Sequence, residues 1–583
     1  MILLAILQGC ASAPSVPGGA LDVALDGVWQ TNAGPQRLPL ALPRTQLVAT
    51  RTVVMPEDWD RDRRAILRGN AIGYRVRAWL GDAEVGSDAG GLRPIAIDLT
   101  GQLKPGNNAL RIVVETASAT NILDGEKVTA VGAYTYQQPR TGEVEALGEL
   151  WLELADARRV DDVDIAYAGG ELTARATVSG AEGEPVLFTV VRDGAELARF
   201  PTSTVSHGVA EATVAWTGPR WELGGSEAPF LQYVVAALPG GATRQVRFGA
   251  REVTRNGTGL ALNGTPTYLA VQRHVADGSE PRDELAQVAA LYASANLNTL
   301  ELHARLHPDA VLQAADELGF PVVLTPLCDG RRRSNGVLPA DAAWAAFIEE
   351  GNRRIVAAHR DHPSLVLWNL EAPAEPAFPS VYAPLGSTDV PFVDHTESQG
   401  YNDEGWARMR YERTYPFINE LAFRAPVLGG ETLLQRLGWL VRSHRAQGIG
   451  CTVPHLLDRG DPEGKRAPEA VGYRAGLVAL FSDLDVPALP VGPRRGPAEL
   501  DVTVRRADAV AAGVIVVLRA PGQAPVAAAT DQQGIAHLAL DYAGPAEVEV
   551  LGVPGPTAVT LTSGRYEGGR WRPAVATATL TLP

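Results

Sequence analysis

The chain has 583 residues, of which 45% are hydrophobic and 20% are charged, and its formal net charge is −15. This length exceeds what one hydrophobic core supports, so we expect several domains, and the composition is that of a globular protein rather than a disordered or membrane-spanning one. The negative charge argues against nucleic acid as a partner, because repulsion from the phosphates would go uncompensated. Three cysteines cannot form a disulfide framework.

The first residues form an apolar run that ends at Cys10 and is too short to span a bilayer. Leu7-Gln8-Gly9-Cys10 resembles the signal of a bacterial lipoprotein, in which the cysteine is acylated and becomes the N-terminus. The resemblance implies that residues 1–18 are signal and linker and that a lipid at Cys10 anchors the protein to a membrane. Because Ala11 rather than Asp follows, it also implies an exported protein of the outer membrane or cell surface. An apolar N-terminal segment without lipid is the alternative.

Residues 19–148 and 149–256 carry the pattern of β-sandwiches. Apolar and polar residues alternate at residues 74–80, and further short strands follow at residues 94–99 and 109–114. Period-two alternation with frequent turn signals predicts antiparallel sheets. We expect a β-sandwich domain over residues 19–148 and an immunoglobulin-like sandwich over residues 149–256, and we see no catalytic pattern in the second.

Residues 257–490 change to an alternation of strands and helices. Strands are predicted at residues 268–274, 297–303, 321–328 and 365–368, and helices at residues 285–293, 308–318 and 340–359. This order predicts a parallel barrel or a doubly wound sheet. In such barrels the chemistry lies at the carboxyl ends of the strands.

Four motifs in this region resemble glycoside hydrolase family 2. In chain order they are Asn263-Gly264-Thr265-Pro266 with Arg273-His274, Ala295-Asn296-Leu297-Asn298-Thr299, Ala315-Asp316-Glu317-Leu318-Gly319, and residues 353–368 with His362-Pro363-Ser364. The resemblance implies a multidomain α/β plus all-β protein. A (β/α)8 TIM barrel over residues 257–490 would be flanked by the N-terminal jelly-roll and immunoglobulin-like sandwiches and a C-terminal β-sandwich. It also implies a carbohydrate substrate.

A retaining glycosidase needs two carboxyl groups about 5.5 Å apart, one to attack and one to protonate the leaving oxygen. The family's acid/base glutamate follows its fourth barrel strand, where this chain reads Asn369-Leu370-Glu371-Ala372-Pro373. Ala372 and Pro373 occupy the family's Asn and Glu positions. Glu371 is two places early and Glu375 two places late, so three alternatives stay open: Glu371, Glu375 or no acid/base at all.

The nucleophile is expected after the seventh barrel strand, where Gly429-Gly430-Glu431 resembles the family pattern. We assign that role to Glu431, with a solvated glutamate at a helix start as the alternative. The resemblance implies substrate-binding side chains at the carboxyl ends of the strands: Arg273, His274, His303, Trp368 and Asn369. Glu301 stands where the family has an arginine. A structural ion pair is the alternative for Arg273 and His274.

No cofactor or metal is predicted, because His303, His307, His395 and His455 do not have the spacing of a zinc motif. Residues 497–583 return to period-two alternation and resemble a Cna-B or carboxypeptidase-regulatory sandwich. The leading hypothesis is therefore a glycosidase that hydrolyses O-glycosidic bonds with retention. The alternative is a carbohydrate-binding surface lipoprotein on a catalytically degenerate barrel. The oligomeric state and the sugar cannot be read from the sequence.

Overall fold

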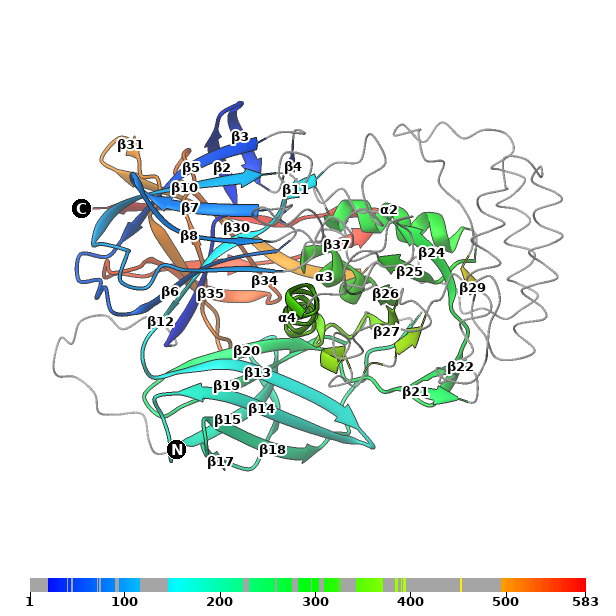
Figure 1. The fold of residues 1–583 in the computed structure, drawn as a ribbon. Helices are drawn as coiled ribbons and strands as arrows, with labels where there is room; N and C mark the ends of the chain where they lie inside the picture. Colours follow the sequence, from blue (N-terminus) through cyan, green and yellow to red (C-terminus); the bar gives the residue numbers. More distant parts are fainter. Residues whose placement is uncertain are drawn as a thin grey trace, which may run out of the picture.

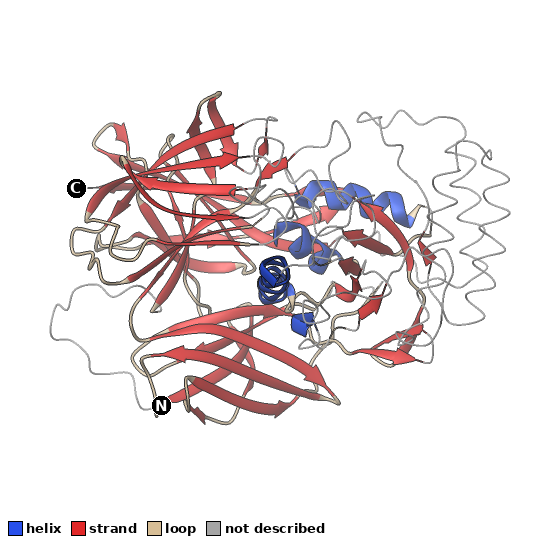
Figure 2. Ribbon diagram, viewed as in Figure 1, coloured by secondary structure: helices blue, strands red, loops and turns tan. Residues whose placement is uncertain are grey.

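The computed structural model describes residues 19–38, 40–42, 46–70, 72, 75–89, 94–115, 145–223, 230–256, 259–274, 281–294, 296–302, 309–324, 326, 342–370, 383–385, 390, 392–394, 451–452 and 494–582. Over these ranges the protein is mostly β-sheet, and its helices lie beside one parallel sheet (Figures 1 and 2). None of the described helices has the length and apolar character needed to cross a membrane.

The N-terminal region forms two sheets packed face to face. One face is lined by buried residues such as Leu67 and Leu152, the other by Val53 and Ile112, and these belong to one hydrophobic core. The first sheet contains β1 (Ala20–Ala24), β12 (Leu150–Ala155), β6 (Arg64–Gly69) and β9 (Ile95–Asp98). The second has the order β3 (Gly34–Leu38), β2 (Gly27–Thr31), β5 (Gln46–Met55), β10 (Gly106–Glu115), β7 (Arg75–Leu80) and β8 (Ala83–Ala89). β4 (Leu40–Leu42) pairs with β11 (Glu145–Leu147).

The C-terminal region extends the first of these sheets. β1 pairs in parallel with β33 (Val526–Ala529), on the edge opposite to β12, and β33 continues into β32 (Ile515–Arg519), β35 (Gly544–Val550) and β36 (Thr557–Leu561). Ile515 and Val517 of β32 lie in the N-terminal core. Figure 1 shows the result: blue N-terminal strands and orange to red C-terminal strands lie together.

The remaining C-terminal strands form a second sheet around β30. Its members are β30 (Arg494–Arg506), β31 (Ala509–Val510), β34 (Ile535–Leu540), β37 (Ser563–Glu567), β38 (Arg570–Arg572) and β39 (Val575–Leu582). Buried side chains of both C-terminal sheets, among them Val502, Val516 and Val548, form a separate core.

The second sandwich has its own core, which contains Phe188, Val234 and Leu172. One sheet is β13 (Arg159–Ala168), β14 (Glu171–Ser179) and β18 (Val209–Ala215). The other contains β15 (Pro185–Arg192), β16 (Ala195–Arg199), β17 (Ser203–Thr204), β19 (Gln232–Ala237) and β20 (Thr243–Phe248). The domain boundaries and the jelly-roll and immunoglobulin-like labels stay predictions.

A small antiparallel sheet of β21 (Val253–Asn256), β22 (Gly259–Leu262) and β23 (Thr265–Thr267) leads into the parallel sheet. That sheet has the order β28 (Phe392–Asp394), β27 (Leu365–Leu370), β26 (Val322–Leu324), β25 (Thr299–Leu302), β24 (Ala270–His274) and β29 (Cys451–Thr452), and its neighbours are all parallel. This order is compatible with the predicted (β/α)8 barrel. The barrel itself stays a prediction, because much of residues 257–490 lies outside the described ranges.

The predicted helices are confirmed as α2 (Pro281–Ala293), α3 (Asp309–Leu318) and α4 (Ala342–His359). The apolar residues of α3 recur at helical spacing, so Val311, Leu312 and Ala315 are all buried. Gly319 ends α3 with a φ of +68°, a left-handed conformation that a side chain would disfavour.

Candidate active site

The carboxyl ends of the parallel strands form the edge where the sequence predicts the active site. β24 ends at His274 and β27 at Leu370. Arg273 is the register partner of Glu301 on β25, and Leu370 is the partner of Asp394 on β28. Residues far apart in sequence therefore meet along one edge, as the alternation of strands and helices predicts.

The predicted site residues are only partly covered by the described residues. Arg273, His274 and Asn369 have defined backbone positions at the ends of β24 and β27, but their side chains lie outside what the structure describes. Trp368 is fully buried in β27, beside Leu324 of β26. The remaining predicted residues lie outside the described residues; they are Glu371, Glu375, Glu431, His303 and Cys10.

Glu301 is an ionisable side chain that is completely buried in the sheet. Its neighbour in the helical layer is Tyr292 of α2, whose pKa is raised well above its ordinary value by burial first and by the charge of Glu301 second. Tyr292 therefore stays a neutral phenol at physiological pH. Glu301 is thus a buried carboxyl group whose register partner on β24 is Arg273.

Asn298, from the second family-like motif, fixes the register of the first two strands. Its Oδ1 accepts a hydrogen bond of 2.8 Å from the backbone N–H of Ala270, and its Nδ2 donates one of 2.9 Å to the carbonyl of Tyr268. The hydroxyl of Thr299 also donates to Oδ1, at 2.8 Å. Because Asn298 is buried, these bonds satisfy groups that would otherwise be desolvated without partners.

Asn263-Gly264, from the first motif, forms the turn between β22 and β23. Asn263 has a φ of +53° and Gly264 a φ of +80°. The Oδ1 of Asn263 accepts from the N–H of Glu252 at 3.0 Å, and its Nδ2 donates to the carbonyl of Trp221 at 2.9 Å. The turn thereby attaches the small antiparallel sheet to the second sandwich.

The third and fourth motifs bind each other through Asp316 and His362. The Nδ1 of His362 lies 2.6 Å from Oδ2 of Asp316, and the N–H of Ser364 donates to Oδ1 at 3.0 Å. Burial acts to lower the pKa of His362, but Asp316 and Asp309 outweigh it and raise that pKa to about 10. Arg251 donates to the carbonyls of Pro363 and Leu365 at 2.8 and 2.9 Å. These contacts position the start of β27.

Glu317, the neighbour of Asp316, connects α3 to three other parts of the chain. It forms ion pairs of 2.9 Å with Arg247 of β20 and 3.1 Å with Arg282 of α2. The hydroxyl of Tyr566, on β37, donates to it at 2.5 Å. The Asp-Glu pair of this motif therefore holds domains together rather than acting on a substrate.

Glu149, which precedes β12, caps the beginning of α3. Its carboxyl oxygens accept hydrogen bonds of 3.0 and 3.1 Å from the N–H groups of Asp309 and Ala310. Burial, followed by the charge of Asp309, raises the pKa of Glu149 to about 8. Through Glu149, Arg247 and Tyr566, the N-terminal region, the second sandwich and the C-terminal region all contact α3.

The chain is similar in sequence to several known proteins. No family model matches the chain. A β-galactosidase of Arthrobacter sp. (strain B7) is 27% identical over 340 residues, which are 55% of this chain and 31% of that protein. A β-galactosidase of Enterobacter cloacae is 23% identical over 344 residues, 55% of this chain and 32% of that protein. The match spans about a third of the length of these relatives.

Solved structures extend the likeness at the level of the fold. Bifidobacterium dentium β-glucuronidase, complexed with coumarin-3-O-glucuronide, superposes with a TM-score of 0.56 at 18% identity, over 82% of this chain and 91% of that one. Faecalibacterium prausnitzii β-glucuronidase gives 0.55 at 16% identity, over 84% and 93%. In sequence and in fold the chain is therefore similar to family 2 glycosidases. The motifs that carry this resemblance include residues that hold the fold together, such as Asn298, Asp316 and His362.

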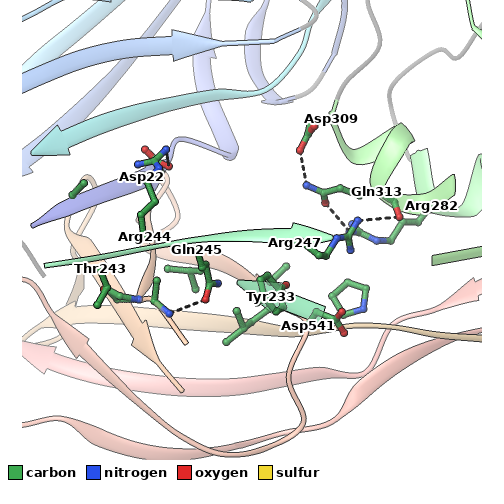
Figure 3. Close-up of a pocket in the computed structure, with 17 residues that line it drawn as sticks. Asp22, Tyr233, Thr243, Arg244, Gln245, Arg247, Arg282, Asp309, Gln313 and Asp541 are labelled. Atoms are coloured by element: carbon green, nitrogen blue, oxygen red, sulfur yellow. Dashed lines mark hydrogen bonds and ion pairs between the residues drawn. The ribbon is translucent and has the colours of Figure 1, made fainter. Parts of the chain in front are cut away.

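A second feature of the protein is a cavity of about 430 Å³ where its regions meet, lined by both polar and apolar side chains (Figure 3). Asp22 of β1, Tyr233 of β19, Arg244 of β20, Gln313 of α3 and Asp541 after β34 line it. Arg244 pairs with Asp22 at 3.1 Å. Among the described residues, none at the carboxyl edge of the parallel sheet lines this cavity, and we call it the junction cavity.

The sequence did not point to this junction. Several of its charged residues come from segments that carry no motif, such as Arg247 in β20 and Asp541 after β34. The short strand that ends at Arg247-Phe248 is a local signal for β-structure, and it does not specify a partner. Asp309, which lines the cavity, also lies beside His359 and His362, and the potential ligand atoms of these three residues lie within 4.8 Å of one another.

Proposed function

We propose that the protein hydrolyses O-glycosidic bonds with retention of configuration, at the carboxyl edge of a (β/α)8 barrel formed by residues 257–490. The observation that carries the proposal is the placement of the family motifs. They position β24, β25 and β27 in one parallel sheet, and Glu371 follows immediately after β27. The sequence similarity to β-galactosidases supports the same reaction class.

In this mechanism Glu431 attacks the anomeric carbon and Glu371 protonates the leaving oxygen; the second step reverses the proton transfer to activate water. Arg273, His274, His303, Trp368 and Asn369 are the proposed contacts to the sugar. The sequence relatives are β-galactosidases and the fold neighbours are β-glucuronidases. Both glycosides are therefore the first substrates to test.

The experiment measures hydrolysis of nitrophenyl β-galactoside and β-glucuronide by the wild type, Glu431→Gln and Glu371→Gln. We expect Glu431→Gln to lose activity on all substrates. Glu371→Gln should lose activity mainly on substrates with poor leaving groups, because activated aryl groups need little protonation. Exogenous azide should restore turnover of aryl glycosides by Glu371→Gln. Unchanged hydrolysis in Glu431→Gln would disprove the mechanism.

The second candidate function is carbohydrate binding without turnover. It is favoured by Ala372-Pro373, which stand where the family has its Asn-Glu pair. Under this proposal a carbohydrate held in the gel retards the wild type in affinity electrophoresis, but the wild type hydrolyses no aryl glycoside. Azide-dependent hydrolysis by the wild type would instead indicate an enzyme that keeps Glu431 and lacks an acid/base.

The cellular location is a proposal of its own. Lipidation of Cys10 would anchor the protein to the outer membrane or cell surface, where glycosides outside the cell are accessible. Metabolic labelling with a fatty-acid analogue tests it. We expect label on the wild type and none on Cys10→Ala; equal labelling of both contradicts a lipid at Cys10.

A further inference from the structure

Two histidines and a carboxylate converge where α4 ends and α3 begins. His359 is the last residue of α4, His362 lies in the turn before β27, and Asp309 is the first residue of α3. The Nε2 of His362 is 2.9 Å from Oδ1 of Asp309, and the Nδ1 of His359 is 3.9 Å from the same oxygen. His359 and His362 are only 7% and 9% exposed.

His359 is the member of this group whose position needs an explanation. Its Nδ1 is buried and has no hydrogen-bond partner, although buried nitrogens are normally satisfied. An imidazole nitrogen that is buried, unpartnered and close to a histidine nitrogen and a carboxylate oxygen can act as a metal ligand.

The surroundings match the outer shell of a metal centre. The other ring nitrogen of His362 contacts Asp316 at 2.6 Å, the arrangement in which a carboxylate orients a metal-binding histidine. The second oxygen of Asp309 accepts a hydrogen bond of 2.6 Å from Gln313, which fixes the carboxylate. The carboxyl group of Glu149 accepts hydrogen bonds from the N–H groups of Asp309 and Ala310 and so fixes the helix start that carries Asp309.

We propose that Asp309, His359 and His362 form a binding site for a divalent cation of the zinc class. Two imidazole nitrogens and one carboxylate oxygen are a common set of zinc ligands. Metal–ligand lengths of about 2.0–2.2 Å in a tetrahedral site separate the ligand atoms by about 3.4 Å, and the distances of 2.9 and 3.9 Å lie on either side of that value. The ion takes the place of the proton between His362 Nε2 and Asp309, and that proton is released to solvent on binding.

This site is separate from the proposed glycosidase chemistry. It precedes β27, at the end of the strand opposite to the one that Glu371 follows. A cation there joins the end of α4 to the beginning of α3, the helix on which all four regions of the chain converge. Its role is therefore to stabilise the junction of the regions, and hydrolysis does not depend on it directly.

The test uses the full chain with a histidine-free tag, freed of metal by a chelator and titrated with ZnCl2 alone by isothermal calorimetry. We expect the wild type to bind one more equivalent of Zn²⁺ than His359→Gln, and to gain thermal stability on binding that His359→Gln does not gain. The matched control is His207→Asn, which removes an exposed histidine in a left-handed turn that asparagine tolerates. It should bind Zn²⁺ as the wild type does.

Identical binding by the wild type and His359→Gln would overturn the site. If His359→Gln does not fold, Asp309→Asn provides the same comparison. X-ray absorption of the wild type loaded with one equivalent of Zn²⁺ needs no variant. It should show two imidazole ligands with oxygen completing the shell, and fewer than two imidazoles would also overturn the proposal.

Discussion

The hydroxyl of Tyr566 donates a hydrogen bond of 2.5 Å to Glu317 across 249 residues of sequence. Both side chains are buried, and Glu317 is at the same time paired with Arg247 and Arg282. The C-terminal region, the second sandwich and the helical layer are therefore coupled through one carboxylate. Replacing any of the three partners of Glu317 should therefore weaken the contact between these regions.

Replacing Tyr566 with phenylalanine should destabilise the protein by about 1.5–3 kcal/mol, because the hydroxyl donates to a buried charged acceptor. Denaturant unfolding followed by tryptophan fluorescence measures this. Tyr542→Phe is the matched control, since that hydroxyl donates to the carbonyl of Pro545 at 3.0 Å within its own region. The control should cost about 0.5–1.5 kcal/mol. Equal losses would mean that the charge on Glu317 does not strengthen its hydrogen bond.

Arg247→Met should cost about 3–5 kcal/mol, because it leaves Asp316 and Glu317 with fewer buried countercharges. The change in the free energy of unfolding is again the quantity to measure. Arg199→Met removes an exposed arginine that pairs with Glu196, and it should change stability by less than about 1 kcal/mol. A loss no larger than that of Arg199→Met would contradict a structural role for Arg247.

Stability should decline in acid partly through Glu317. Burial acts to raise the pKa of this carboxyl, but Arg282 and Arg247 outweigh it and hold the pKa below its ordinary value. The unfolded chain therefore takes up the proton first, and the contribution of Glu317 is full above about pH 4.3 and is lost as pH falls through the folded pKa. Unfolding between pH 3 and 7 should show a shallower acid decline for Glu317→Gln than for the wild type, and equal declines would contradict this contribution of Glu317.

Ile515→Ala should destabilise the N-terminal sandwich although residue 515 belongs to the C-terminal region. Its side chain is 1% exposed and lies in the core that includes Trp29. Removing buried methyl groups there should cost about 2–5 kcal/mol. Val510→Ala, at a position 48% exposed, should cost less than about 0.5 kcal/mol. If Ile515→Ala leaves the midpoint of unfolding unchanged, the two regions do not share a core in solution.

The elements near the family-like motifs were predictable because their signals are local. Apolar spacing and Gly319 predict the two ends of α3 to within a residue or two. The motif His362-Pro363-Ser364 predicts where β27 begins. The same motifs suggested catalytic relevance, whereas Asn298, Asp316 and His362 make structural contacts. The proposed catalytic residues Glu371 and Glu431 lie outside the described residues and stay predictions.

The long-range contacts had no such signal. The pairing of β1 with β33 depends on tertiary packing, since a strand's pattern specifies which face is buried but not which strand lies beside it. The cap that Glu149 provides for α3 likewise depends on a contact between distant segments. The same is true of the contact between Asp309 and His359. The spacing of His359 and His362 is visible in the sequence, but the carboxylate that completes the group is not adjacent to them.

The pairing of β1 with β33 has a consequence for biosynthesis. Close to this pairing, the N–H of Val28 donates a hydrogen bond to Asp531, which lies 503 residues later in the chain. At translation rates of about 5–20 residues per second, the ribosome needs about 25–100 s to deliver the second partner. During that time one edge of β1 exposes unpaired backbone groups, a template for association with other chains. Newly made protein should therefore depend on chaperones until its last region emerges.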